Sequence, residues 1–128
     1  MTWDEYGTIC RDRGALGLQV FACLTTPAKA GTPPPALLAE HLAYQRALEA
    51  QGALFLAGPL SDATGTAMSG AGLIVYAAKD LAAAQALAAA DPMHQSGQRA
   101  FTLQAWRLNE GAPLPGLQLS SRSFDRLA

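Results

Sequence analysis

The sequence is poor in residue types that mark specialised proteins. Its two cysteines, Cys10 and Cys23, have neither a CxxC nor a metal-binding spacing. This scarcity argues against a disulfide scaffold and favours free thiols in a reducing cytoplasm. Charged residues make up 15% of the chain, and nine basic against ten acidic residues leave a net charge of −1 with no block of either sign. Nucleic-acid binding needs a basic patch, so we expect no nucleic-acid partner.

Long hydrophobic runs are also missing. The longest uncharged, mainly apolar run, residues 63–78, contains three glycines and is too short and too polar to cross a bilayer. The chain opens with acidic residues where a secretory signal is basic, and no apolar segment follows. These absences predict a cytoplasmic protein without a membrane partner.

Branched aliphatic residues other than leucine are rare. The chain has 2 isoleucines and 2 valines against 27 alanines and 19 leucines. The core must therefore consist of leucine, a few aromatic residues and close alanine contacts. A chain of 128 residues, half of them hydrophobic, suffices for one domain with one core. We expect a single domain over residues 1–128, with its core at about 18–108.

Local patterns predict an order of helix, then β-α-β-β-α-β. Thr2 and Glu5 have the spacing of a capping box. Segments rich in proline, glycine and other turn residues separate the periodic stretches. This order is the ferredoxin-like arrangement, an α+β fold in which a four-stranded antiparallel sheet carries two main helices on one face. The predicted helices are 3–13, 36–51 and 81–90, and the predicted strands are 18–24, 53–60, 73–77 and 98–108.

The second face of the predicted sheet is not polar. Two helices cover one face, and the opposite face carries apolar side chains whichever strand parity faces the helices. Packing against a second copy of the chain is the simplest cover, and twofold symmetry is the commonest kind. We therefore expect a homodimer. The apolar sets are Phe21, Ile74 and Trp106 in one parity, and Val20, Leu54 and Leu103 in the other.

The final segment, residues 111–128, shows no clear period. It contains five large apolar residues, among them Phe124, which is more than a disordered tail usually has. We expect an arm that docks on the edge of its own sheet or on the partner subunit, with Phe124 as its anchor.

Only a few polar residues are candidates for chemistry. His41 shares a helix face with Leu37, Tyr44 and Leu48, where it is either a half-buried structural histidine or a pocket base able to accept a proton near neutral pH. Asp91 either caps the turn that Pro92 begins or orients a histidine. The residues alone leave both alternatives open.

Other polar segments carry less information. His94 follows Asp91 by three residues and is predicted at the surface. No close pair of ligands supports a metal site. Gly58 ends a strand and removes a side chain where a ligand could approach the backbone. The glycine-rich stretch 65–72 lacks the lysine of a phosphate-binding loop and is predicted to be a hairpin loop.

Several segments together resemble the YciI-like (YCII-related) family. The resemblance rests on four pieces: His41-Leu42-Ala43-Tyr44, the G-x-L-x-x-A-G-P pattern of residues 52–59, Asp91-Pro92-Met93, and Trp106. It implies a ferredoxin-like fold assembled as a dimeric α+β barrel. It also implies an active site centred on a histidine–aspartate pair, which His41 and Asp91 match.

The resemblance also implies a function. It points to a small cofactor-independent enzyme in which His41 removes a proton and Asp91 orients it, with lyase, isomerase or dehydrochlorinase-like chemistry on a small cyclic or aromatic substrate. Tyr44, Gly58, Pro59 and Met93 would line the substrate pocket. The alternative is a non-catalytic module that binds a small molecule or regulates through the same pocket. An acid–base pair alone does not distinguish the two.

Overall fold

The structure is a computed structural model that describes residues 1–111. The described residues form two compact units: Met1–Gln19 with the part of the described chain that starts at Arg107, and Val20–Trp106. Residues 112–128 of the predicted arm, with Phe124, lie outside the described residues. The docking of the arm and the single domain over 1–128 therefore stay predictions.

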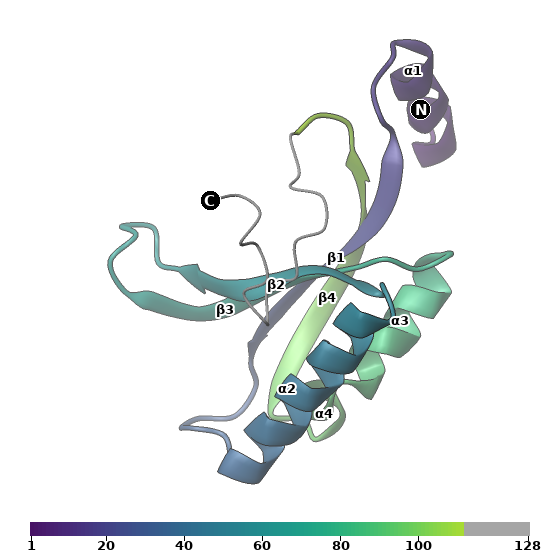
Figure 1. The fold of residues 1–128 in the computed structure, drawn as a ribbon. Coiled ribbons are helices and arrows are strands. Elements are labelled where there is room, and N and C mark those ends of the chain that lie inside the picture. The colour runs from purple at the N-terminus through teal and green to yellow at the C-terminus, as the bar shows by residue number, and fades with distance from the viewer. Residues whose placement is uncertain (112–128) are drawn as a thin grey trace, which may run out of the picture. The chain divides into compact units, whose positions relative to one another are not determined.

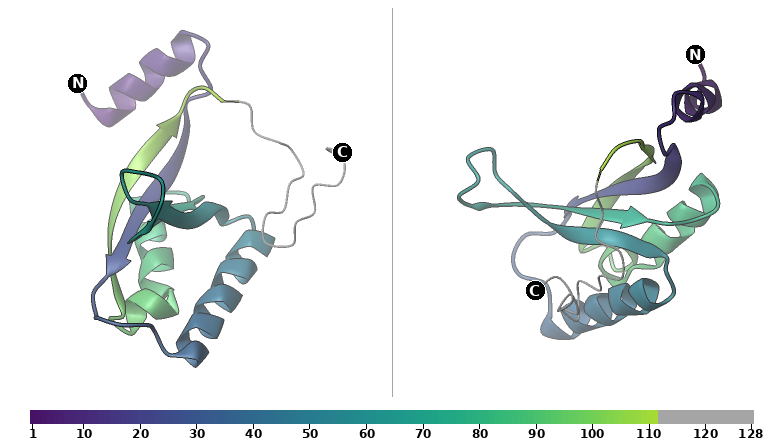
Figure 2. Two further views of the ribbon diagram at one scale, coloured as in Figure 1. Left: turned by 90° about the vertical axis from the view of Figure 1, so that its left-hand side faces the viewer. Right: turned by 45° about the horizontal axis from the view of Figure 1, so that its top comes forward.

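The strands form one four-stranded sheet in the order β2-β3-β1-β4. β3 pairs antiparallel with both β1 and β2. Helices α2 and α3 lie on the same face of this sheet (Figure 1, Figure 2). The predicted ferredoxin-like α+β fold is confirmed. The elements are α1 (Trp3–Asp12), β1 (Leu18–Pro27), α2 (Pro35–Ala50), β2 (Leu54–Ser61), β3 (Met68–Tyr76), α3 (Leu81–Ala90), α4 (Pro92–Gln95) and β4 (Arg99–Leu108).

Local signals set the helix ends. The Thr2 hydroxyl accepts from the Glu5 N–H, and the Glu5 carboxylate accepts from the Thr2 N–H, so the predicted capping box begins α1. Asp80 caps α3 by accepting from the Ala83 N–H. After α2 the chain reverses at Gly52, whose φ of 76° lies in the left-handed region that glycine adopts easily.

Two strands run further than their sequence patterns predict. β1 continues to Pro27 because Thr25 pairs with Gly72 of β3. β3 begins at Met68, inside the predicted loop, because Met68 pairs with Ser61 across the β2–β3 hairpin. Pairing between strands therefore extends β3 through serine, glycine and alanine, which have little strand preference, and extends β1 as far as a proline.

The core fills the space between the sheet and helices α2 and α3. Ala84 and Ala88 are fully buried one helical turn apart on α3. Their small side chains let α3 approach the sheet closely, as its alanine-rich sequence predicts. The fully buried members of this core are Phe21, Cys23, Leu48, Ile74, Tyr76, Ala84 and Ala88.

The other sheet face carries exposed apolar side chains. Leu24 and Trp106 follow core-facing Cys23 and Ala105 in their strands, so strand alternation places them on this face. Both are more than 40% exposed. The face therefore has the apolar character that the sequence predicts, but the predicted grouping of its residues is wrong. Trp106 lies on the face opposite Phe21 and Ile74, whereas Leu54 and Leu103 pack on the core side with them.

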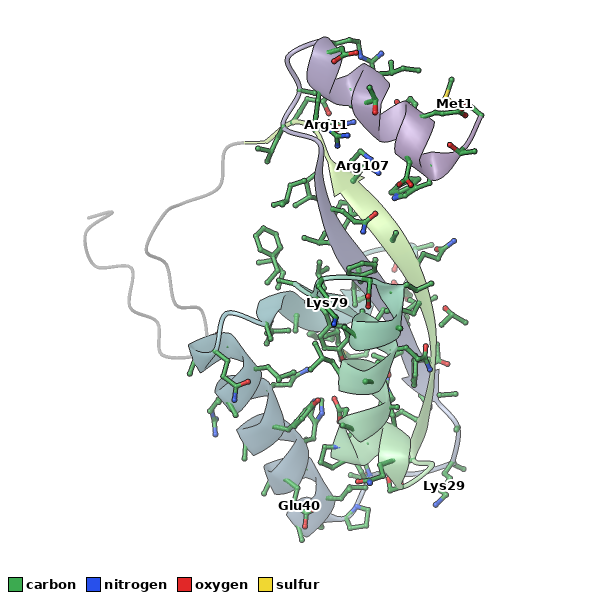
Figure 3. All side chains as sticks on the ribbon, turned by 90° about the vertical axis from the view of Figure 1, so that its right-hand side faces the viewer. Met1, Arg11, Lys29, Glu40, Lys79 and Arg107 are labelled. Atoms are coloured by element: carbon green, nitrogen blue, oxygen red, sulfur yellow. The ribbon has the colours of Figure 1, made fainter. Side chains whose placement is uncertain are left out.

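The N-terminal unit is organised by Arg107. Its guanidinium lies over the Trp3 ring, with Cζ 4.6 Å from the ring centroid, and donates to the carbonyls of Gly17 and Trp3 (Figure 3). A Cβ at Gly7 would lie 2.6 Å from the Arg107 Cζ. Gly7 is therefore the residue of α1 that makes room for this side chain.

Candidate active site

His41 and Asp91 form a hydrogen-bonded pair. Nδ1 of His41, on α2, lies 2.8 Å from Oδ1 and 3.0 Å from Oδ2 of Asp91, which joins α3 to α4. A carboxylate accepts hydrogen bonds, so the pairing places the proton of a neutral His41 on Nδ1 and leaves Nε2 with a free lone pair. His41 is 17% exposed and Asp91 only 1%. The two residues that the family resemblance pairs are therefore in direct contact, and their catalytic role stays a prediction.

Asp91 makes both contacts that the sequence left as alternatives. Its Oδ1 accepts from the Met93 N–H at 2.9 Å, which caps α4 at the turn that Pro92 begins. The same carboxylate accepts from His41. A buried carboxylate needs such donors, because burying one without them is very costly.

The charge of Asp91 influences the groups around it. Burial, followed by the negative charge of Asp91, raises the pKa of the Cys23 thiol to about 11. The same two causes, in the same order, raise the pKa of Tyr44. Cys23 and Tyr44 are therefore neutral near pH 7.

His41 lines a cavity of about 420 Å³ beside the sheet. Its walls come from α2, α4, the β2–β3 pair, the end of β1 with the segment that follows it, and the start of β4. A volume of this size is within the usual range for sites that bind small molecules. Predicted site residues Gly58, Pro59 and Met93 also line it, and the apolar walls include Leu38, Leu42, Ala57, Met68 and Ile74.

Tyr44 does not line this cavity, contrary to the prediction. Its hydroxyl donates to the Leu87 carbonyl of α3 at 2.7 Å, and its ring packs against the core. The helical spacing from His41 was correct, but the long side chain reaches across to α3. Tyr44 therefore links two helices.

The prediction that His94 lies at the surface is wrong. Its side chain is half-buried and lines the cavity. Nδ1 lies 2.7 Å from the Ala88 carbonyl, and Nε2 lies 2.8 Å from the Thr25 hydroxyl. The ring also packs on Phe101. The single turn of α4 directs His94 back toward the sheet, which spacing from Asp91 alone does not show.

Sequence reasoning missed five further polar residues of the cavity, namely Thr25, Lys29, Gln45, Gln98 and Arg99. Arg99, at the start of β4, donates from Nε to the Thr25 hydroxyl at 3.0 Å, and from Nη2 to the carbonyls of Thr25 and Gly70 at 3.0 and 2.7 Å. One signal was available. Arg99 continues the apolar, core-facing parity of Phe101 and Leu103, and a charge in that position points inward.

Metal ligands and membrane segments give no further candidate. Among residues 1–111 there is no group of three or more histidine, cysteine, aspartate or glutamate side chains that could hold a metal ion. Within the same residues, no helix is long and apolar enough to cross a bilayer.

Comparison with known proteins identifies the family. The model of the YCII-related domain matches residues 20–107. The chain belongs to the YCII-related family. Among curated proteins, none matches it. A solved structure of 5-chloro-2-hydroxyhydroquinone dehydrochlorinase from Burkholderia phenoliruptrix, in complex with 2,5-dihydroxybenzoquinone, is 21% identical and has a TM-score of 0.50. The match covers 68% of this chain and 92% of that one, and it supports the fold.

Proposed function

We propose that this YCII-related chain is a small enzyme that uses no cofactor and performs acid–base chemistry with His41. Nε2 of His41 would take a proton from an acidic C–H or O–H group of a substrate in the cavity. Asp91 would hold the ring in place and stabilise the imidazolium that forms. The observation that carries this proposal is the buried 2.8 Å contact between Asp91 and Nδ1, which leaves Nε2 as the free nitrogen of a cavity-lining histidine.

The proposal limits the substrate to an activated one. A positioned general base accelerates a reaction by roughly 10²–10⁴-fold, too little for an inert C–H bond. The mainly apolar walls suit a small ring. The structurally similar dehydrochlorinase supports elimination as the first reaction to test. In that step His41 takes the proton, the C–H electron pair forms a C=C bond, and the C–Cl pair leaves with chloride.

We also propose that the domain works as a homodimer. The exposed apolar side chains on the sheet face away from α2 and α3 support this assembly. Two copies that pack through these faces would cover Leu24 and Trp106.

The experiment is a turnover assay on a panel of chlorinated hydroquinones, hydroxyquinones and small lactones. Chloride release and C–H exchange in D₂O report elimination and proton abstraction separately. We expect His41→Asn to lower turnover by about 10²-fold or more. Arg46→Gln, on the exposed side of the same helix, is the matched control and leaves turnover unchanged. Equal activity of the wild type and His41→Asn would refute the proposal, and a ligand that binds without turnover would support the binding-module alternative.

A further inference from the structure

The described walls of the cavity carry positive charge and no acidic residue. Lys29, in the segment after β1 (Figure 3), and Arg99 both line the cavity, and among residues 1–111 no aspartate or glutamate does. Asp91 lies behind His41, and its carboxylate is occupied by His41 and the Met93 N–H. Within residues 1–111, Arg99 forms no ion pair. A partly buried guanidinium without a counter-charge is suited to an anionic ligand.

Three hydrogen bonds fix the guanidinium and use one side of it. Nε donates to the Thr25 hydroxyl, and Nη2 donates to the carbonyls of Thr25 and Gly70. No acceptor among the described residues binds Nη1, so its two N–H groups remain for a ligand. Nη1 is therefore held in place before any ligand binds.

His94 fixes the direction of these bonds. The Ala88 carbonyl can only accept, so Nδ1 of His94 donates to it, and Nε2 of a neutral ring accepts from the Thr25 hydroxyl. The lone pairs of that hydroxyl are then directed to accept from Arg99 Nε. Thr25 is 6% exposed. His94 is thus a positioning residue that acts on Arg99 through Thr25.

We propose that Arg99 is the anchor for an anionic oxygen of the ligand. The ligand class is a small planar ring that carries a carboxylate, phenolate or enolate oxygen. This inference rests on the proposed function of the same cavity. If the acidic C–H is conjugated with that oxygen, the charge released when His41 takes the proton spreads to the atom that Arg99 contacts. Arg99 would then contribute to both affinity and rate.

The test compares a charged probe with an uncharged one of the same shape. The probe is 2,5-dihydroxybenzoquinone, whose hydroxyls are vinylogous acids and ionise at neutral pH; the uncharged one is its dimethyl ether. Calorimetric titration of the wild type should show tighter binding of the anion. Arg99→Gln should weaken anion binding by about tenfold or more and leave binding of the ether nearly unchanged. Arg46→Gln, an exposed cation outside the cavity, is the matched control.

Arg99→Gln loses the donor to the carbonyls of Thr25 and Gly70, so this variant could fail to fold. A second measurement therefore tests the proposal on the wild type. A crystal structure of the wild type with the anion should place one ligand oxygen within about 2.7–3.1 Å of Arg99 Nη1. The inference would be overturned if the wild type did not bind the anion or bound the ether equally well. It would also be overturned if a folded Arg99→Gln still preferred the anion, or if the anion bound away from Arg99.

The outcome is separable from that of the proposed function. His41→Asn should still bind the anion through Arg99, whereas Arg99→Gln retains the base. Loss of turnover in His41→Asn with no effect of Arg99→Gln on binding would overturn the anchor alone. Anion-selective binding without any turnover would support the anchor and refute the enzyme.

Discussion

Gly72 lies opposite Thr25 in the β1–β3 register, and a Cβ at Gly72 would lie 3.2 Å from the Thr25 Cγ2. The same atom would lie 3.4 Å from the Gly58 carbonyl oxygen. The close approach of β1, β2 and β3 at this point therefore depends on the missing side chain at Gly72. Gly58 differs, because a Cβ there would meet nothing within 4 Å.

The pair of glycines gives a matched test. Gly72→Ala should displace Thr25 by a few tenths of an ångström, lower stability by about 1–2 kcal/mol and weaken binding of the anion at Arg99. Gly58→Ala has room in the fold and should leave stability equal or up to about 1 kcal/mol higher. Urea unfolding and calorimetric titration of both variants measure these effects. If both variants behave alike, Gly72 has no special role in placing Thr25.

Substitutions of Asp91 should separate its two roles. Asn caps a helix about as well as Asp, so Asp91→Asn should change stability by less than about 1 kcal/mol. It removes the charge that stabilises the imidazolium, so turnover should fall by at least about tenfold. Asp91→Ala also loses the cap and should cost about 2 kcal/mol of stability.

Asp80→Ala is the control for these variants. It removes the cap of α3, which the Asp80 carboxylate provides to the Ala83 N–H, and should cost about 1 kcal/mol while turnover is kept. Urea unfolding and steady-state kinetics are the measurements. Full activity of Asp91→Asn would contradict a role for this carboxylate in proton transfer.

Contacts between residues close in sequence could be predicted from the sequence, whereas contacts between residues far apart in sequence could not. Thr2 and Glu5 lie within one helical turn, so their spacing alone predicts the capping box correctly. The His41–Asp91 pair spans 50 residues, and only the family resemblance joined them. The Arg99–Thr25 contact spans 74 residues, and its register depends on strand pairing that no local pattern encodes.

Tyr44→Phe tests the corrected place of Tyr44. The change removes the hydrogen bond to the Leu87 carbonyl and should cost about 0.5–1.5 kcal/mol of stability. Because the ring does not line the cavity, the affinity for the anion should stay within about twofold of wild type. Thermal or urea unfolding and calorimetric titration report the two effects. A large loss of affinity for the anion with unchanged stability would indicate that Tyr44 belongs to the binding site.

Cys23 should make stability depend on alkaline pH. Burial and Asp91 raise the pKa of the folded thiol from an ordinary 9.0 to about 11, so the unfolded chain loses this proton first. The stabilising contribution is complete below pH 9 and is lost as the pH rises to about 11. The difference in unfolding free energy between wild type and Cys23→Ala should therefore shrink by about 2 kcal/mol over this interval.

Cys10→Ala is the matched control for that titration. Burial raises the pKa of the Cys10 thiol, but hydrogen bonds from Arg13, Asn109 and Tyr6 outweigh burial and lower it. The difference between wild type and Cys10→Ala should not shrink in the same interval. Urea unfolding at several pH values gives all three curves, and parallel curves for wild type and Cys23→Ala would contradict the shift.

The apolar sheet face predicts a dimer in solution. Sedimentation at low micromolar concentration should give about twice the chain mass of 13.3 kDa. Leu24→Glu places a charge on this face and should yield monomers, whereas Leu81→Glu, at the exposed start of α3, should not. A monomeric wild type would refute the assembly.

The shortest helix of the described chain, α4, contacts both polar groups of residues in the cavity. One is the His41–Asp91 pair, and the other is Arg99 with Thr25. Four residues are too few to keep a helix stable through their own hydrogen bonds. α4 is held by Asp91 at its start and by the His94 contacts to Ala88 and Thr25. A substitution that breaks these contacts of α4 would disturb the proposed base and the proposed anion anchor together. Ligand preference can change with least disturbance at the apolar walls, at Leu38, Leu42 or Met68, so divergence of specificity among related chains should concentrate there.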